Sequence, residues 1–188
     1  MGVSTDRHRV RSAGRRARQS IVGDQRRTAE QSLVQHLRSL QASHAASVGV
    51  FIAHDGEPNL MAFIDWVWGR GCTVALPVLD DDPEDFTMRF VPWIRGEALT
   101  SGRYGISVPA PVDAIVPETL LVSLTGFDSA GNRMGRGAGF FDRYLKETSC
   151  NVVGVGFENQ RFASIPTEPH DQPLPIVATD LGVRFIQK

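Results

Sequence analysis

One stretch decides the fold of this chain, Gly126-Phe-Asp-Ser-Ala-Gly-Asn-Arg-Met-Gly-Arg-Gly-Ala-Gly-Phe-Phe-Asp-Arg-Tyr-Leu145. Within it three glycines alternate, Gly135, Gly137 and Gly139, and Arg133 and Arg136 stand beside them. The apolar run 119–124 precedes the stretch, and the run 140–145 has the composition of a helix rich in aromatic residues. We therefore predict a strand, a flexible loop and a helix, in that order.

The glycine-rich loop has the composition of an anion-binding site. Glycines let backbone N–H groups approach an anion closely, and the start of a helix adds the positive end of its dipole. The two arginines supply planar, forked donors that suit phosphate or carboxylate. The loop lacks the Gly-Lys-Ser/Thr ending of the nucleoside-triphosphate P-loop and the glycine spacing of the dinucleotide fingerprint. A phosphate site is the favoured interpretation, and an ordinary turn is the alternative.

Apolar runs on the N-terminal side of this stretch predict a layered fold. Residues 48–53 and 73–76 are expected to be buried strands, with a helix beginning at Pro58 between them and Pro77 ending the second strand. Strand–helix–strand units of this kind favour a parallel sheet. We expect an α/β fold: a single three-layer domain over 1–188 with a mostly parallel central sheet flanked by helices, Rossmann-like in arrangement.

The other elements follow from the same periodicities. An amphipathic helix is predicted over 24–40, with Asp24 as its cap. Its apolar face consists of Ala29, Leu33, Val34, Leu37 and Leu40. Residues 86–93 alternate like a half-buried edge strand, and residues 95–118 are expected to be an ordered loop. Three further strands are predicted at 151–157, 176–178 and 183–186.

Charge is nearly balanced overall but uneven along the chain. The net charge is −1, so nothing global indicates a nucleic-acid or membrane surface. Eight arginines fall between Arg7 and Arg27, against one acid, Asp24. Residues 1–20 are expected to form a basic helix or arm, with Gly14 as a weak point. An anion-binding helix, a solvated tail and a nucleic-acid arm are the alternatives, and the lack of interleaved aromatics disfavours the last.

The cysteines and the apolar runs bear on the compartment. Cys72 and Cys150 stand far apart and outside any metal-type spacing, which favours buried free thiols in a reducing environment. The N-terminus has no apolar run of signal-peptide length, and no stretch approaches the roughly 20 apolar residues of a membrane helix. We expect a cytoplasmic protein.

Polar residues in two loops are weaker candidates for function. Glu57 follows the first predicted strand, where ligands gather in open α/β sheets, although an exposed loop Glu is usually just solvated. His170 and Asp171 form a His-Asp pair, but such a pair in a loop is more often turn chemistry. The sequence has no nucleophile-elbow Ser and no Cys in a credible triad setting, which disfavours a hydrolytic triad.

The segment 133–145, with Gly126-Phe-Asp before it, resembles the signature of the 5-formyltetrahydrofolate cyclo-ligase family, also called methenyltetrahydrofolate synthetase. The similarity extends over nearly the whole chain. It implies one cyclo-ligase-like domain and an ATP-dependent carbon–nitrogen ligase that converts 5-formyltetrahydrofolate to 5,10-methenyltetrahydrofolate, with release of ADP and phosphate. It also implies Mg²⁺ as cofactor. The expected partners are ATP and the folate, with one or more glutamates, and no nucleic acid or membrane; we expect a monomer or weak homo-oligomer.

The resemblance also implies site residues. The nucleotide-binding positions are Arg7, Arg11, Arg133, Met134, Gly135, Arg136, Gly137, Ala138, Gly139, Phe140 and Phe141. The folate-binding positions are Ile52, Glu57, Arg136 and Phe140. The magnesium-associated carboxylates of the family match Asp142 and Asp171. Arg136 and Asp142 are the residues expected to be catalytic.

This sequence departs from the family pattern at several positions. Arg7 stands where Lys is common, Ser123 where a Pro usually precedes the glycine-rich segment, and Ala138 where Gly or Lys is frequent. Phe140 and Phe141 replace a common Tyr-Tyr pair, which removes hydroxyls but keeps stacking surface. We expect these departures to change the affinity for ligands more than the way in which phosphate is bound. They leave a non-catalytic folate- or nucleotide-binding regulatory protein as the alternative function.

Overall fold

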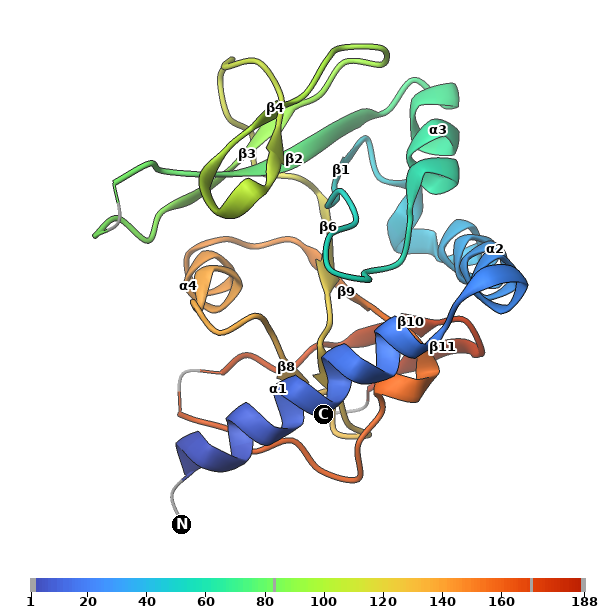
Figure 1. Ribbon diagram of the computed structural model, residues 1–188. Coiled ribbons are helices and arrows are strands. Elements are labelled where there is room, and N and C mark those ends of the chain that lie inside the picture. The colour runs from blue at the N-terminus through green and yellow to red at the C-terminus, as the bar shows by residue number, and fades with distance from the viewer. Residues whose placement is uncertain (1–2, 83, 170, 187–188) are drawn as a thin grey trace.

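A seven-stranded sheet forms the centre of the molecule (Figure 1). The computed structural model describes residues 3–82, 84–169 and 171–186. The sheet strands are β1 (Ser47–Gly49), β2 (Thr73–Leu79), β3 (Met88–Pro92), β6 (Thr119–Ser123), β9 (Asn151–Val155), β10 (Ile176–Thr179) and β11 (Gly182–Phe185). They lie in the order β11-β10-β9-β6-β1-β2-β3. Only β3 and β11, the two edges, pair in antiparallel fashion among the described strands of this sheet, which confirms the mostly parallel α/β fold.

Helices cover both faces of this sheet and make the three layers (Figure 1). The α-helices are α1 (Val3–Ser20), α2 (Gly23–Ser39), α3 (Met61–Gly69) and α4 (Phe140–Glu147). Successive strand residues point to opposite faces. Leu121 of β6 therefore packs in the cluster with α2 and α3, whereas Leu120 and Val122 pack with α4. The predicted apolar face of α2 is buried, as expected.

Two strand predictions are wrong at their ends. β1 stops at Gly49, so the next residues leave the sheet earlier than expected. β2 does not end at Pro77 but continues to Leu79, with Pro77 opposite Phe90 of β3. The carbonyl of Ala75 accepts a bond on the β1 side, and the backbone of Pro77, two residues on, faces the same side. Because β1 has ended there, the missing N–H of Pro77 removes no bond to a neighbouring strand.

Two helix starts also differ from the prediction. α3 begins at Met61 rather than Pro58. Val22 precedes α2 and no side chain caps that helix, so the prediction of Asp24 as its cap is wrong. Asp24 instead pairs with Arg27 one turn along.

Small hairpins replace parts of both predicted loops. Within 95–118 the chain forms β4 (Thr100–Ser101), the 3₁₀ turn η2 (Arg103–Gly105) and β5 (Ser107–Val108). Within the glycine-rich stretch, β7 (Gly126–Phe127) pairs with β8 (Arg133–Met134), and only residues 135–139 remain a loop before α4. Two further 3₁₀ turns are η1 (Gln41–His44) and η3 (Glu158–Gln160).

The basic N-terminal segment is a packed helix rather than a solvated tail. α1 contacts β7, β8 and η3, and lies beyond the ends of the parallel strands in Figure 1. Gly14 is buried, and a Cβ at this position would lie 1.8 Å from the carbonyl oxygen of Thr125. This glycine therefore permits close packing, whereas the sequence suggested only a weak point. No described helix is both long enough and apolar enough to cross a membrane.

Candidate active site

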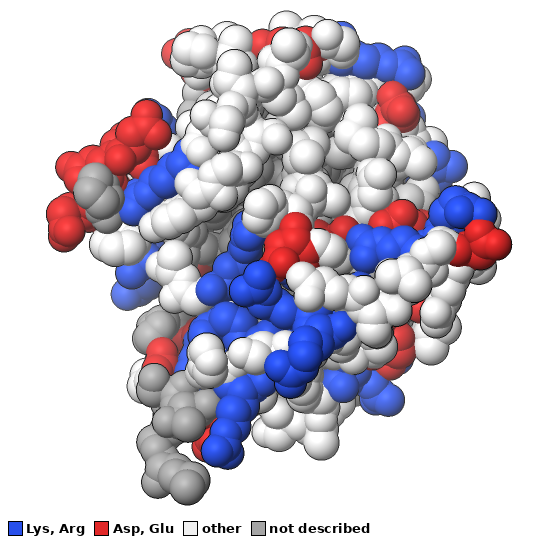
Figure 2. All heavy atoms as spheres, in the orientation of Figure 1, with Lys and Arg blue, Asp and Glu red and all other residues white. Residues whose placement is uncertain are grey.

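A large pocket opens beyond the carboxyl ends of β1 and β6. Its volume is about 670 Å³. Its walls come from α1, the turn after β1, the end of β6, the β4–β5 hairpin, the glycine loop and the start of α4. Parallel sheets place their ligand sites at this edge because loops from several strands meet there. Figure 2 shows a hollow in the surface with arginine and lysine side chains gathered along one side of it.

The pocket brings together almost all of the site residues implied by the resemblance. Its lining includes Arg7, Arg11, Ile52, Glu57, Arg133, Gly135, Arg136, Gly137, Ala138, Gly139, Phe140, Phe141 and Asp142. Met134 is fully buried and does not line the pocket. Asp171 is also absent from the lining but pairs with Arg7. His170 lies outside the described residues.

The glycine loop forms one wall and is held against α1. Arg11 donates from Nε to the carbonyl oxygen of Gly135 at 3.1 Å. Gly137 and Gly139 have φ angles of +116° and +71°, which favour glycine. Gly139 is the residue that precedes α4, so the loop ends at a helix N-terminus, a common setting for bound anions.

Two arginine–aspartate pairs lie next to the glycine loop, and three of their four residues, Arg7, Arg133 and Asp142, line the pocket. Arg7 donates from Nη1 to Oδ2 of Asp171 at 2.5 Å, and Arg133 donates from Nη2 to Oδ1 of Asp142 at 2.5 Å. The carbonyl oxygen of Gln172 accepts a further bond from Arg133, and the backbone N–H of Gln172 donates to Oδ1 of Asp142 at 3.4 Å. The two pairs therefore form one cluster between α1, β8, α4 and the 168–172 segment.

Burial and pairing act in opposite directions on these arginines. The hydrogen bond with Asp171 raises the pKa of Arg7, which burial would lower. Burial lowers the pKa of Arg133, which is 5% exposed, although Asp142 opposes this effect. Both guanidinium groups nevertheless remain cationic, because the ordinary pKa of arginine is far above neutrality. Each guanidinium charge in this cluster is therefore balanced by a carboxylate. Arg11 and Arg136, which line the pocket and form no salt bridge with a described residue, add the net positive charge.

The carboxylates differ in their fitness for magnesium. Both hydrogen bonds that Asp142 accepts fall on Oδ1, which leaves Oδ2 for a cation. Asp171 is committed through both oxygens, since Arg7 donates to each and the N–H of Glu168 donates to Oδ2. Mg²⁺ commonly takes one or two protein carboxylates and completes its shell with phosphate oxygens and water. Asp142 fits that pattern better than Asp171, and the described residues contain no cluster of three or more metal-type ligands.

Glu57 also lines the pocket, at the end of the turn after β1. It is 3% exposed, so the prediction that an isolated loop Glu is merely solvated does not apply here. Ser123 donates from Oγ to Oε1 of Glu57 at 2.8 Å, and the N–H of His54 donates to Oε2 at 3.1 Å. Ile52 lines the pocket beside it, and Arg136 is exposed at the rim.

The β4–β5 hairpin contributes an aromatic rim that sequence analysis missed. Tyr104 has a φ of +58° and lies edge-on to Phe140, with ring centroids 6.4 Å apart. Arg103 stacks over both rings, at 5.0 and 5.7 Å, and donates to the carbonyl oxygens of Asp80, Asp82 and Asp85. Those three residues lie between β2 and β3, in an acidic connection whose side chains gather at the left of Figure 2. The Gly-Arg-Tyr-Gly sequence of 102–105 signals a turn, but nothing in it shows what the turn covers.

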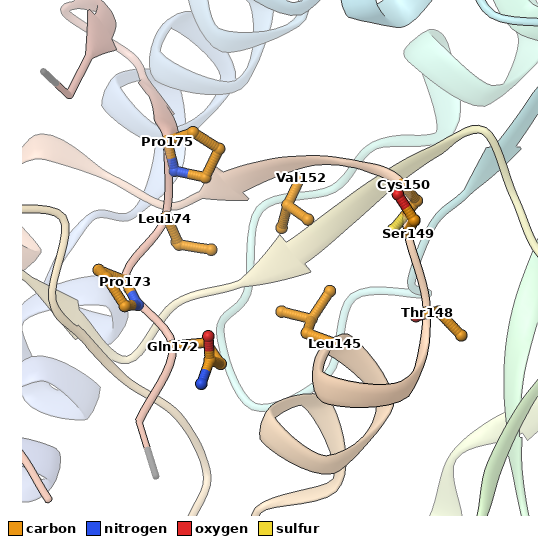
Figure 3. Close-up of a pocket in the computed structure, with 9 residues that line it drawn as sticks. All are labelled: Leu145, Thr148, Ser149, Cys150, Val152, Gln172, Pro173, Leu174 and Pro175. Carbon is orange, nitrogen blue, oxygen red and sulfur yellow. The ribbon is translucent and has the colours of Figure 1, made fainter. Parts of the chain in front are cut away.

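A smaller hollow of about 230 Å³ lies beside α4 and the segment 172–175 (Figure 3). Leu145, Val152 and Leu174 point into it, and Cys150 lies at one end. Cys150 and Cys72 are free and half-buried. Burial raises the pKa of the Cys150 thiol, so the nucleophilic thiolate is scarce at neutral pH. This hollow therefore supplies no nucleophile to the larger pocket.

Fold and pocket together define a class of protein: a Rossmann-like α/β protein whose arginine- and glycine-lined pocket suits an anionic ligand. The model of the 5-formyltetrahydrofolate cyclo-ligase family matches residues 3–180. The chain belongs to that family, and its class of enzyme is therefore that of the ligases.

Individual relatives agree with the family match. The 5-formyltetrahydrofolate cyclo-ligase of Haemophilus influenzae is 30% identical over 177 residues, which cover 89% of this chain and 94% of the relative. That of Mycolicibacterium smegmatis is 30% identical over 142 residues, covering 71% and 73%. The solved structure of 5,10-methenyltetrahydrofolate synthetase from Aquifex aeolicus superposes with a TM-score of 0.83 over 97% of this chain and 93% of that chain, at 23% identity. The resemblance noted in the sequence is thus confirmed, and the shared fold with it.

Proposed function

We propose that this protein converts 5-formyltetrahydrofolate and ATP into 5,10-methenyltetrahydrofolate, ADP and phosphate. One observation carries the proposal: the lining of a single pocket combines phosphate-type donors, the arginines and the glycine loop, with the buried carboxylate of Glu57. A triphosphate end and a pteridine can therefore meet in it. The family match supports the same reaction.

The physical difficulty of this reaction is a poor leaving group. A formyl oxygen cannot depart as oxide. In the proposed route that oxygen attacks the terminal phosphorus of ATP, and ADP leaves. The neighbouring folate nitrogen then attacks the formyl carbon and gives up its proton, the ring closes, and phosphate departs with the former formyl oxygen. No protein nucleophile is required, so catalysis rests on positioning and on stabilising phosphate charge.

The residues of the pocket have side chains of the kind that this route needs. In the proposal the phosphates are bound by the loop amides of 135–139 and by four arginines, Arg7, Arg11, Arg133 and Arg136. Phe140 offers a face for stacking, and Ile52 an apolar wall. Glu57 accepts hydrogen bonds from the donor edge of the pterin. Magnesium held at Asp142, with Asp171 beside it, would neutralise charge on the phosphates.

A turnover assay tests the proposal directly. Mixing the protein with Mg·ATP and 5-formyltetrahydrofolate should produce the methenyl chromophore in a strictly ATP-dependent manner. Each chromophore formed should be matched by one phosphate released. Calorimetry that detects ligand binding without any chromophore would favour the regulatory alternative instead.

Glu57→Gln should raise the KM for the folate roughly tenfold and leave the KM for ATP unchanged. The substitution replaces one carboxylate acceptor by an amide donor, which faces the donor edge of the pterin unfavourably. Steady-state kinetics with each substrate varied in turn measures both constants. Equal changes in the two KM values would show that Glu57 supports the pocket as a whole rather than the folate.

A further inference from the structure

The Glu57 carboxylate is held from more than one side before any ligand arrives. Oε1 accepts the Ser123 hydroxyl at 2.8 Å, and Oε2 accepts the backbone N–H of His54 at 3.1 Å. A carboxylate offers about four lone-pair positions, so roughly two remain for a ligand. Its orientation is therefore set by the protein, and the remaining acceptor positions have a fixed direction.

Arg18 of α1 approaches the same carboxylate from within the protein. It is 1% exposed, and its Nη1 lies 3.7 Å from Oε1 of Glu57. Its Nη2 donates to Oδ2 of Asp55 at 2.8 Å, its Nε donates to the Asp55 carbonyl oxygen at 2.7 Å, and Arg15 pairs with Asp55 at 2.7 Å. The four residues form a row of alternating charge, Arg15–Asp55–Arg18–Glu57. Burial lowers the pKa of Arg18, while Glu57 and Asp55 oppose that effect.

The backbone of the turn is fixed as tightly as the side chain. Asp55 and Gly56 have φ angles of +54° and +79°, and the N–H of Glu57 donates to the carbonyl oxygen of His54 at 3.1 Å. A Cβ on Gly56 would lie 3.0 Å from Cγ of Gln19 in α1. A non-glycine residue at positive φ is strained, and surrounding contacts must hold it in place. Here the C-terminal half of α1 provides those contacts.

We propose that Ser123 and Arg18 are positioning residues, which fix the Glu57 carboxylate so that it selects ligands with paired N–H donors. The inference rests on the proposed function for the identity of the ligand. The Ser123 hydroxyl supplies the side-chain donor that this role requires. A carboxylate that could rotate would accept donors in many arrangements, whereas this one favours two donors at one spacing and direction.

Calorimetry of 5-formyltetrahydrofolate binding, without ATP, tests the role of Ser123. Ser123→Ala should raise the Kd roughly three- to tenfold, as expected for one lost hydrogen bond to a charged group, and Ser123→Thr should restore it. The KM for ATP should not change in either variant. No change in Kd for Ser123→Ala, or no rescue by Ser123→Thr, would overturn the inference.

A double-mutant cycle separates positioning from simple packing. If Ser123 acts through Glu57, adding Ser123→Ala to Glu57→Ala should raise the Kd less than twofold, because the acceptor is already gone. Full additivity would overturn the inference. Thermal unfolding of each variant checks that the fold persists.

The ratio of the Kd values of two ligands tests both positioning residues. A loss of stability alone would not change this ratio. The unsubstituted protein should bind an analogue without the pterin 2-amino group at least tenfold more weakly than the folate. The ratio of the Kd for the analogue to the Kd for the folate should fall toward one in Ser123→Ala and fall further in Arg18→Lys. An unaltered ratio in both variants would overturn the inference. Folate binding without turnover would defeat only the proposed function, and absence of folate binding would defeat both.

Discussion

Asp142→Ala is expected to lower kcat by about 10²–10³ and to remove most of the dependence of the rate on magnesium. Asp142 lines the pocket, and both of its hydrogen bonds fall on Oδ1, so its Oδ2 is available for a cation. It is also the side-chain partner of Arg133, which is buried. Leaving that guanidinium without its carboxylate should also cost about 3–5 kcal/mol of the free energy of unfolding. Single-turnover kinetics at several magnesium concentrations, with thermal unfolding in parallel, measures both effects.

Two further variants separate the roles of this carboxylate. Asp142→Asn keeps an oxygen acceptor for Arg133 and Gln172, so it should lose most of the magnesium dependence but less of the stability. Asp171→Asn should weaken stability through Arg7 and change the magnesium dependence less, because Asp171 is already committed through both oxygens. A larger effect on magnesium at Asp171 than at Asp142 would reverse the assignment of the metal position.

Gly14→Ala is expected to destabilise the protein by about 2–4 kcal/mol and to weaken ATP binding roughly tenfold. The new Cβ would meet the backbone of Thr125 at 1.8 Å, and backbone cannot rotate away as a side chain can. α1 must therefore shift, and it carries Arg7 and Arg11 with it. In an isolated helix the same change would stabilise by about 1 kcal/mol, so the clash decides the sign. Thermal unfolding and nucleotide titration measure the two effects.

Gly69 offers a matched control for this substitution. It also lies in an α-helix, α3, and a Cβ there would meet nothing within 4 Å. Gly69→Ala should therefore be neutral or slightly stabilising, with ATP affinity unchanged. Similar losses in both variants would mean that the loss at Gly14 does not come from the contact with Thr125.

The sequence was sufficient for the layers and for one wall of the pocket. The apolar stripe of α2 and the apolar runs of the sheet strands follow from burial, whose pattern is visible in the local sequence. The glycine loop at 135–139 was predictable for the same reason, since its chemistry and its backbone freedom lie within a few residues of each other.

Features that depend on two distant segments were not predictable. Pro77 looked like the end of a strand. It is tolerated inside β2 because β1 stops at Gly49, about thirty positions earlier in the chain, and the local sequence does not show this. Gly14 looked unfavourable for a helix because the sequence near α1 does not show that Thr125 packs against this position. The sequence predicts a turn near Tyr104, but it does not show that this hairpin lies against the pocket. In each case a residue that is locally unfavourable is acceptable because of a tertiary neighbour.

The contacts of α1 have a consequence for the order in which the molecule can be completed on the ribosome. The helix is synthesised first, yet Arg7 finds its partners at Pro166 and Asp171, near the other end of the chain. A nascent chain that stops before these positions can build much of the sheet but cannot anchor the start of α1. If the protein binds a nucleotide as proposed, that binding should appear only when the segment from Pro166 to Asp171 has been made, and truncation before Pro166 should abolish it.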